Sequence, residues 1–247
     1  MTAVTRPPGS RAARYGPNMT APINHDAVET DEHPAEWAAL LATDFRRFSM
    51  IHKFAIDEVT TKINILREEF INLHDYNPIE HVISRLKTRQ SVIAKARRRG
   101  CTPEIGSVRE AVRDIAGLRI TCSFVSDVYR MFEVFTAQSD IKVVDVDDYI
   151  ANPKPNGYQS LHATIEVPVF LSTGAENVYV EIQFRTVAMD FWASLEHKIY
   201  YKYDRDVPES LLAELKEAAD TAAALDRRMQ RLHREVASLQ PGFGLPD

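Results

Sequence analysis

The protein has 247 residues, of which 45% are apolar and 26% are charged, and its formal net charge is −5. These values are typical of one globular domain with appendages, and they exclude a chain built as a whole to bind nucleic acid. No apolar run approaches the ~20 residues that a membrane-spanning helix needs. Cys101 and Cys122 have no metal-binding spacing and are too few for a disulfide framework, so we expect reduced thiols in a cytoplasmic protein.

The N-terminal part is predicted to begin as a disordered tail and to continue as helix. Residues 1–30 are rich in Pro and Gly, poor in core-forming side chains, and contain no apolar segment typical of a secretory signal. Apolar residues then recur at helical spacing over 37–48 and 56–73. They predict two helices, or one broken helix, that end near residues 75–78, where the Asn77-Pro78 step breaks a helix.

The middle of the chain mixes strands with helices, which predicts an α/β (α+β) fold with a mixed sheet of about five strands flanked by helices. Val82 and Ile83 are expected to point inward from the first strand. The predicted strands cover residues 78–86, 118–124, 141–146, 160–170 and 177–185, the last two joined as a hairpin. The predicted helices cover residues 91–99, 128–135 and 192–203.

The last predicted strand carries the most informative pattern. Its apolar residues alternate with a second set, and the two sets should point to opposite faces. The second set is Tyr179, Glu181, Gln183 and Arg185. One face therefore presents a carboxylate, a carboxamide and a guanidinium in register, which is unlike a solvated strand face. Thr186 is expected to cap the helix that follows.

A basic segment precedes this region. From His81 to Pro103 there are seven Lys and Arg residues and no Asp or Glu, which suggests a compact polyanion as ligand. Arg85 and Lys87 should share a strand face, and a helix face should carry Ser91, Lys95 and Arg98. Both sets could converge on a chain of phosphates. The alternatives are a solvated basic helix and a single-stranded nucleic-acid groove, although the groove should contain interleaved aromatic residues.

Two further segments offer polar chemistry near predicted strands. Asp114 suits Mg²⁺, which takes one or two carboxylates together with phosphate oxygens, although it could instead cap a helix or pair with Arg113. Lys154, Tyr158 and His162 supply a cation, an aromatic face and an imidazole. Tyr158 could stack on a base with ~1–3 kcal/mol. The structural alternatives are a half-buried core tyrosine and a hydrogen-bonded structural histidine.

The C-terminal helix is predicted to begin at Pro208 and to carry a heptad seam. Two interpretations stay open: the helix lies on its own domain, or it pairs with a helix of another subunit, which the length and narrowness of the seam favour. The seam consists of Leu211, Leu215, Ala218, Ala222, Leu225, Met229, Leu232, Val236 and Leu239.

Taken together and in order, five segments resemble the synthetase domain of the RelA/SpoT family, and most of all the single-domain small alarmone synthetases. The resemblance covers roughly residues 35–240 and implies a nucleotidyltransferase-like synthetase fold with long terminal helices. The segments are Arg85-x-Lys87 with Ser91 and Lys95, 114–119, 156–162, 181–186 and 188–197. The domains are then a tail over 1–30, a catalytic domain over 31–205 and an oligomerisation helix over 206–240.

The resemblance implies transfer of pyrophosphate from ATP to the ribose 3′-hydroxyl of GDP or GTP, giving ppGpp or pppGpp and AMP. Asp114 and Glu181 would hold Mg²⁺, and Glu181 would act as general base. The ATP-binding residues would be Arg85 and Arg119, which resemble the arginines that sandwich adenine, and Lys87, Ser91, Lys95 and Arg98 at the phosphates. The residues at GDP or GTP would be Lys154, Asn156, Tyr158, His162, Gln183 and Asp190. Asp190 could recognise guanine, because a carboxylate accepts hydrogen bonds from both the ring N–H and the amino group of guanine. The alternative is that Asp190 is an aspartate at a helix N-terminus, favoured there by the helix dipole.

The resemblance also sets expectations about partners. No region resembles the family's hydrolase or regulatory segments, so we expect synthesis without hydrolysis and no ribosome-docking domain. A homotetramer through the terminal helices is expected, and single-stranded RNA is a candidate regulator. The competing hypotheses are a toxin-type relative that modifies adenosine nucleotides or tRNA, and a non-catalytic module that binds RNA or senses nucleotides.

Overall fold

The computed structural model describes residues 37, 45–74, 76–202 and 207–239. The predicted tail over 1–30 lies outside these residues, as does most of the first predicted helical segment. Within the described ranges, no helix is long and apolar enough to cross a membrane.

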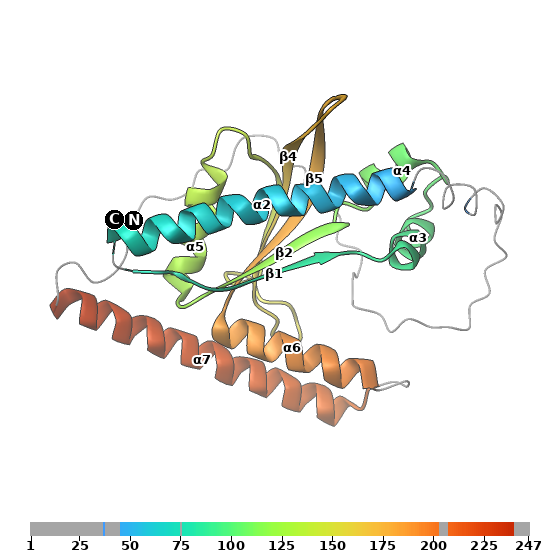
Figure 1. Ribbon diagram of the computed structural model, residues 1–247. Coiled ribbons are helices and arrows are strands. Elements are labelled where there is room, and N and C mark those ends of the chain that lie inside the picture. The colour runs from blue at the N-terminus through green and yellow to red at the C-terminus, as the bar shows by residue number, and fades with distance from the viewer. Residues whose placement is uncertain (1–36, 38–44, 75, 203–206, 240–247) are drawn as a thin grey trace, which may run out of the picture.

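One mixed sheet organises the molecule (Figure 1). Its order is β1-β2-β5-β4-β3; β2 and β5 run parallel and every other neighbouring pair is antiparallel. The prediction of about five mixed strands is confirmed, as is the hairpin, in which Leu171 pairs with Gly174. The strands are β1 (Ile79–Leu86), β2 (Ala116–Cys122), β3 (Lys142–Asp148), β4 (Leu161–Leu171) and β5 (Gly174–Thr186).

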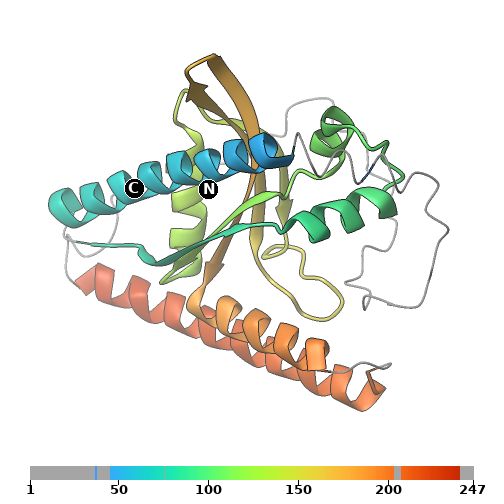
Figure 2. The same cartoon turned by 45° about the vertical axis from the view of Figure 1, so that its right-hand side comes forward.

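In the described part of the chain, six helices lie around this sheet, and two of them cover its apolar face. In both views α2 lies across the sheet, and α5 packs beside it (Figures 1 and 2). The short α4 was not predicted from the sequence. The helices are α2 (Phe45–His74), α3 (Arg89–Arg98), α4 (Ile105–Ala111), α5 (Val125–Thr136), α6 (Val187–Lys202) and α7 (Glu209–Leu239).

The main core lies between these two helices and the sheet. Val59 and Ile63 of α2 are fully buried against strand residues such as Ile182, and Phe135 of α5 joins the same cluster. Fully burying a side chain of this size contributes roughly 1.5–3 kcal/mol. The core therefore fixes the sheet from one side and leaves its other face to polar residues.

The opposite face of the sheet is polar, and the strand pairing aligns its residues in rows. Arg85, Gly117, Glu181, Thr164 and Asp145 stand level across the five strands. Directly paired residues point to the same face, so this row brings side chains from distant segments together. The polar face is where the predicted functional residues gather.

One prediction about this face is wrong. Val82 packs against the core as expected, but Ile83 is 53% exposed and lies level with Arg119 on the polar face. Adjacent strand residues point to opposite faces, so the two side chains could not both point inward.

The C-terminal helix α7 lies beside α6 in both views (Figures 1 and 2). Trp192 Nε1 donates to the carbonyl of Leu215 at 2.9 Å, Thr186 Oγ1 donates to Asp226 at 2.6 Å, and the amide of Ser126 donates to Gln230 at 2.9 Å. A polar and apolar stripe of α7 therefore docks on its own domain.

The predicted heptad seam is divided by this docking. Leu215 is buried against the domain, so the first interpretation holds for that part of the seam. The later part is exposed: Leu225, Met229, Leu232, Val236 and Leu239.

Candidate functional site

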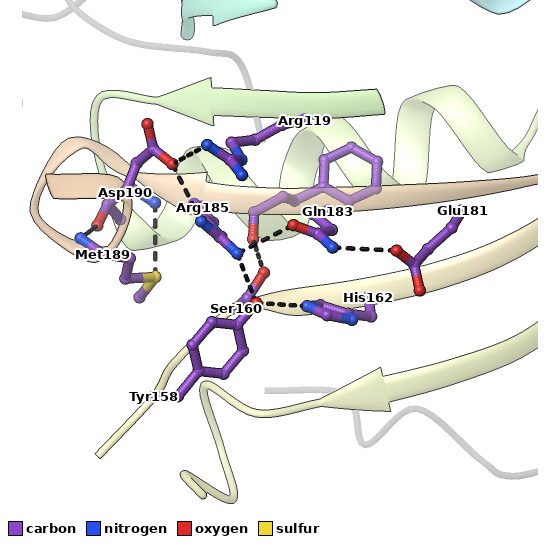
Figure 3. A network of polar contacts seen from close by, with 11 residues as sticks. Arg119, Tyr158, Ser160, His162, Glu181, Gln183, Arg185, Met189 and Asp190 are labelled. Carbon is purple, nitrogen blue, oxygen red and sulfur yellow. Dashed lines mark hydrogen bonds and ion pairs between the residues drawn. The ribbon is translucent and has the colours of Figure 1, made fainter. Parts of the chain in front are cut away.

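A buried guanidinium joins a network of polar side chains near the end of β5 (Figure 3). Arg185, on β5, is only 5% exposed. Its Nη2 donates to Tyr158 Oη at 2.6 Å and to Gln183 Oε1 at 2.9 Å, and its Nη1 lies 3.1 Å from Asp190 Oδ1. One side chain therefore joins a strand, a loop and the start of α6.

Glu181, the predicted general base, is held through the next residue of the same strand face. Gln183 Nε2 donates to Glu181 Oε2 at 3.0 Å (Figure 3). The strand alternation that predicted these two residues on one face is confirmed by their burial pattern. A carboxylate fixed by a hydrogen bond is suited to accept a proton from one direction.

His162, on β4, continues the network from the other side. Tyr158 Oη and His162 Nε2 are 2.7 Å apart (Figure 3). Burial, together with the charges of Arg185, Lys154 and Arg119, lowers the pKa of His162 to about 3. The imidazole is therefore neutral at pH 7 and acts as a hydrogen-bonding group rather than as a cation.

The loop before β4 places a lysine against two aromatic rings. Lys154 Nζ lies 4.4 Å from the ring centroid of Tyr149 and 5.1 Å from that of Tyr158. Burial lowers the pKa of Lys154. Cation–π contacts of this kind stabilise a partly desolvated ammonium by ~0.5–2 kcal/mol.

Asn156 and Gly157 shape this loop. The amide of Tyr158 donates to Asn156 Oδ1 at 3.1 Å, and Asn156 Nδ2 donates to Glu196 at 3.3 Å. Gly157 has φ +86°, and a Cβ there would clash with Ala219 of α7. The loop therefore needs glycine for its backbone conformation and for its close contact with α7.

Asp190 accepts from two arginines. Arg119 Nη1 and Arg185 Nη1 lie 3.0 Å and 3.1 Å from the same oxygen, Oδ1. Asp190 follows the helix cap that the sequence predicts, since the amide of Met189 donates to Thr186 Oγ1 at 3.1 Å. The cap fixes where α6 begins and therefore where this carboxylate lies.

A second charged cluster surrounds Asp114. Lys87 Nζ and Lys95 Nζ lie 2.6 Å and 2.7 Å from Asp114 Oδ2. Burial opposes ionisation, but the two lysines outweigh it and lower the pKa of Asp114. Its Oδ1 is buried and has no hydrogen-bond partner in the described part of the chain. Lys87, which lies just beyond β1, and Lys95 of α3 therefore meet at this carboxylate, one from each predicted set. That the two sets bind phosphates stays a prediction.

The remaining residues of the basic segment are placed less tightly. Arg85 is exposed opposite Gly117, and Ser91 Oγ contacts Thr88 Oγ1 at 2.9 Å at the start of α3. Arg98 is exposed one turn beyond Lys95 and makes no contact with Asp114 among the described interactions. These three side chains are exposed or partly exposed, so a ligand can contact them, but they are not part of a preformed cluster.

The two clusters are connected through neighbouring parallel strands. Glu181 stands level with Gly117 of β2, and Asp114 lies in the turn two residues before β2 begins. Among the described residues, no three His, Cys, Asp or Glu side chains gather into a closed metal site. The geometry is therefore that of an open polar face with two acids, rather than a caged ion.

Comparisons with known proteins identify the family. Residues 84–206 match the model described as the region found in RelA / SpoT proteins. The GTP pyrophosphokinase YwaC of Bacillus subtilis is 49% identical over 193 residues, which cover 78% of this chain and 92% of YwaC. YjbM of the same organism, also a GTP pyrophosphokinase, is 39% identical, with 81% and 93% covered. The chain belongs to the RelA/SpoT family.

Solved structures place it among the small alarmone synthetases of that family. The crystal structure of small alarmone synthetase 2 from Bacillus subtilis has a TM-score of 0.71 at 48% identity, covering 78% of this chain and 99% of that one. Small alarmone synthetase 1 bound to its product pppGpp has a TM-score of 0.71 at 38% identity, with 78% and 97% covered. A GTP pyrophosphokinase family protein from Streptococcus pneumoniae has a TM-score of 0.74 at 31% identity, with 83% and 99% covered.

Arg185 belongs to this RelA/SpoT site, although the sequence pattern placed it on the strand face without assigning it a role. The alternation that picked out Glu181 and Gln183 includes it, so a signal was present. Its role depends on burial and on contacts with Tyr158 and Asp190. Both residues lie on other elements, so the alternation along the strand cannot predict these contacts.

Proposed function

We propose that the protein is a guanosine nucleotide 3′-pyrophosphokinase that makes ppGpp or pppGpp and AMP from ATP and GDP or GTP. The relatives YwaC and YjbM are GTP pyrophosphokinases. Solved structures of small alarmone synthetase 1 hold its product pppGpp or AMPCPP. The observation that carries the proposal is Glu181, held by Gln183 on the polar face beside the strand that follows Asp114.

In the proposed reaction the 3′-oxygen of the acceptor forms a bond to the β-phosphorus of ATP. The bond between that phosphorus and the α–β bridging oxygen breaks, and AMP leaves with the electron pair. Glu181 takes the proton of the 3′-hydroxyl, a role that typically contributes ~10²–10⁴-fold. Transfers of this type otherwise depend on positioning and charge neutralisation, which the lysines and arginines of the face supply.

The residues present fit a divalent cation. Asp114 Oδ1 is a buried acceptor without a partner among the described residues, and Glu181 accepts through Oε2 from Gln183. Mg²⁺ is typically held by one or two carboxylates together with substrate phosphates, so Asp114 and Glu181 would hold it. When bound, Mg²⁺ neutralises phosphate charge during transfer.

The ATP side is assigned to the basic segment and to β2. Lys87 and Lys95 would turn from Asp114 to the phosphates, joined by Ser91 and Arg98. Arg85 and Arg119 are diagonal neighbours on antiparallel strands, ~7–8 Å apart, which is about twice a stacking distance. Gly117 has no side chain to fill the space between them. A flat adenine ring would fit there, once Arg119 parts from Asp190.

The acceptor side is assigned to the loop before β4 and to the start of α6. Tyr158 would stack on guanine, and Lys154 would bind the acceptor phosphates. His162, being neutral, would contribute a hydrogen bond rather than a charge. Both arginines contact Asp190 at Oδ1, so Oδ2 is the oxygen that would meet the guanine edge. Asn156 would hold the loop before β4 in place, and Gln183 would hold Glu181, the general base.

Assembly belongs to the same proposal. The exposed later part of the α7 seam, from Leu225 to Leu239, would pair with other copies of the chain in a homotetramer. Synthesis without hydrolysis and regulation by single-stranded RNA stay predictions from the family resemblance.

The test is incubation of the purified protein with ATP, Mg²⁺ and either GDP or GTP in separate reactions, followed by separation of nucleotides by anion exchange. We expect AMP and a guanosine tetra- or pentaphosphate in equal amounts, and loss of both in a Glu181→Gln variant. Release of AMP only with adenosine acceptors, or labelling of tRNA without a product from GDP, would instead support the toxin-type alternative. Binding of oligonucleotides without AMP release would support the non-catalytic module.

A further inference from the structure

Arg185 differs from every other cation of the site in its surroundings. It is buried, whereas Lys154, Lys87 and Lys95 are partly exposed, and it contacts oxygen atoms of three residues: Gln183, Tyr158 and Asp190. Its Nε has no hydrogen-bond partner among the described residues. No role for it follows from the proposed binding sites. A buried guanidinium is planar, carries only donors and stays charged, so it imposes an orientation on each group that it meets.

The first consequence concerns the base. Because Arg185 can only donate, the atom of Gln183 that faces it must be the oxygen. The amide nitrogen of Gln183 then faces Glu181, to which it donates at 3.0 Å. If the amide were reversed, an oxygen would face the carboxylate and repel it.

The second consequence concerns the tyrosine and the histidine. Tyr158 Oη accepts from Arg185, which leaves its single proton available for donation to His162 Nε2, 2.7 Å away. In this arrangement His162 Nε2 is the acceptor and the ring proton resides on Nδ1. Two hydrogen-bond chains therefore start at one guanidinium and run outward in a fixed direction.

We propose that Arg185 is a positioning residue for pyrophosphate transfer, which directs Gln183 toward Glu181 and, through Tyr158, fixes His162 as its Nδ1-protonated tautomer. The inference rests on the proposed function, because it takes Glu181 as the base. Its effect on the reaction is indirect: Arg185 need not touch either nucleotide. Misplacement of a catalytic group by about 1 Å can reduce the rate ~10²-fold.

The first test reads the tautomer in the nucleotide-free protein. Two-bond ¹H–¹⁵N correlation spectra of histidine-labelled protein distinguish the two tautomers, and comparison with His162→Gln assigns the signals. We expect the Nδ1-protonated pattern in the wild type and its loss in Arg185→Lys, Arg185→Gln and Tyr158→Phe. Arg228→Lys, at an exposed position of α7, is the matched control and should keep the wild-type pattern.

The second test reads the reaction with ATP and GDP. We expect kcat to fall ~10²-fold in Arg185→Lys, which keeps the charge but not the planar fork, with a smaller change in the KM for ATP. Thermal melts identify a variant that does not fold. If Arg185→Gln does not fold, the results for Arg185→Lys and Tyr158→Phe test the positioning role of Arg185. An unchanged His162 pattern in Arg185→Lys overturns the inference, and so does a changed pattern with wild-type kcat.

The failure of the proposed function would look different. Wild-type turnover in Glu181→Gln would remove the base assignment while leaving the tautomer result intact. Loss of turnover in Glu181→Gln, combined with wild-type turnover and tautomer in both Arg185 variants, would overturn the positioning role alone.

Discussion

The two polar clusters of this sheet are built on opposite principles. Around Asp114, one carboxylate is contacted by two lysines, all three side chains are partly exposed, and one carboxylate oxygen has no partner among the described residues. Around Arg185, a buried guanidinium contacts three oxygen atoms of the protein that lie on three different elements.

The difference indicates which cluster changes its partners during the reaction. Lysines are flexible point charges that a phosphate can attract away, and Oδ1 of Asp114, which has no partner among the described residues, can accept a contact from a cation. A buried arginine that lost its partners would leave several polar groups unsatisfied, each at ~1–3 kcal/mol. We therefore expect the Asp114 cluster to exchange its contacts when substrates bind and the Arg185 cluster to keep them.

The largest effect is expected for Asp114→Asn, which removes a charge from the exchanging cluster. The kcat/KM for pyrophosphate transfer should fall at least ~10³-fold, equivalent to about 4 kcal/mol of transition-state stabilisation. Binding of Mn²⁺ in the presence of a non-hydrolysable ATP analogue, followed by electron paramagnetic resonance, should weaken in parallel. Asp140→Asn, whose carboxylate pairs with the distant Lys62, is the control. Undiminished Mn²⁺ binding in Asp114→Asn would contradict the metal assignment.

A smaller loss is expected for Gly157→Ala, which tests whether the loop beside the Arg185 cluster is fixed. The added methyl group needs an unfavourable backbone conformation and meets Ala219, so the loop and Tyr158 should shift. We expect the KM for the acceptor to rise ~10²-fold in steady-state kinetics. Gly106→Ala is the matched control, because a Cβ there meets open space and the residue lies within α4. Equal kinetics in the two variants would mean that the loop adapts freely.

Tyr158→Leu should weaken the binding of the acceptor, raising the Kd for GDP measured by calorimetry about tenfold. The substitution removes the aromatic face that we assign to guanine, and stacking of this kind contributes ~1–3 kcal/mol. Tyr158→Phe keeps the ring and should bind GDP with nearly unchanged affinity. If both variants bind GDP as the wild type does, the ring does not contact the base.

The last prediction concerns stability rather than turnover or binding, and it is a pH dependence due to His162. Its pKa is about 3 in the folded protein and about 6.5 when unfolded, so between these values the unfolded chain binds the extra proton. Stability is then present above pH 6.5 and lost as the pH falls, by at most about 1.4 kcal/mol per pH unit. Urea denaturation between pH 6.5 and 4 should show a shallower loss in His162→Gln than in the wild type. His81→Gln, at an exposed position of β1, should follow the wild type.

Much of the fold and of the site could be predicted because it depends on local periodicity. Alternation placed Glu181 and Gln183 on one face, and the basic segment indicated where Lys87 and Lys95 converge. The prediction failed for Ile83, where an apolar residue lies on the polar face, and it missed α4, a seven-residue helix with only Val108 buried and no side-chain N-cap.

What the sequence could not supply is the set of contacts between distant elements. Asp226 and Gln230 lie on α7 beside an apolar seam and give no local sign that they bind Thr186 and the amide of Ser126. The same holds for Arg185, whose partners come from the loop before β4, from its own strand and from α6. Such contacts depend on how the layers pack, and only the structure reveals them.

The most direct test of the difference between the two clusters is a crystal structure with Mg²⁺ and a non-hydrolysable ATP analogue. We predict that Lys87 and Lys95 part from Asp114 and contact phosphate oxygens, while Arg185 keeps its contacts with Gln183, Tyr158 and Asp190. A structure in which both lysines stay on Asp114, or in which Arg185 exchanges its partners, would contradict the account.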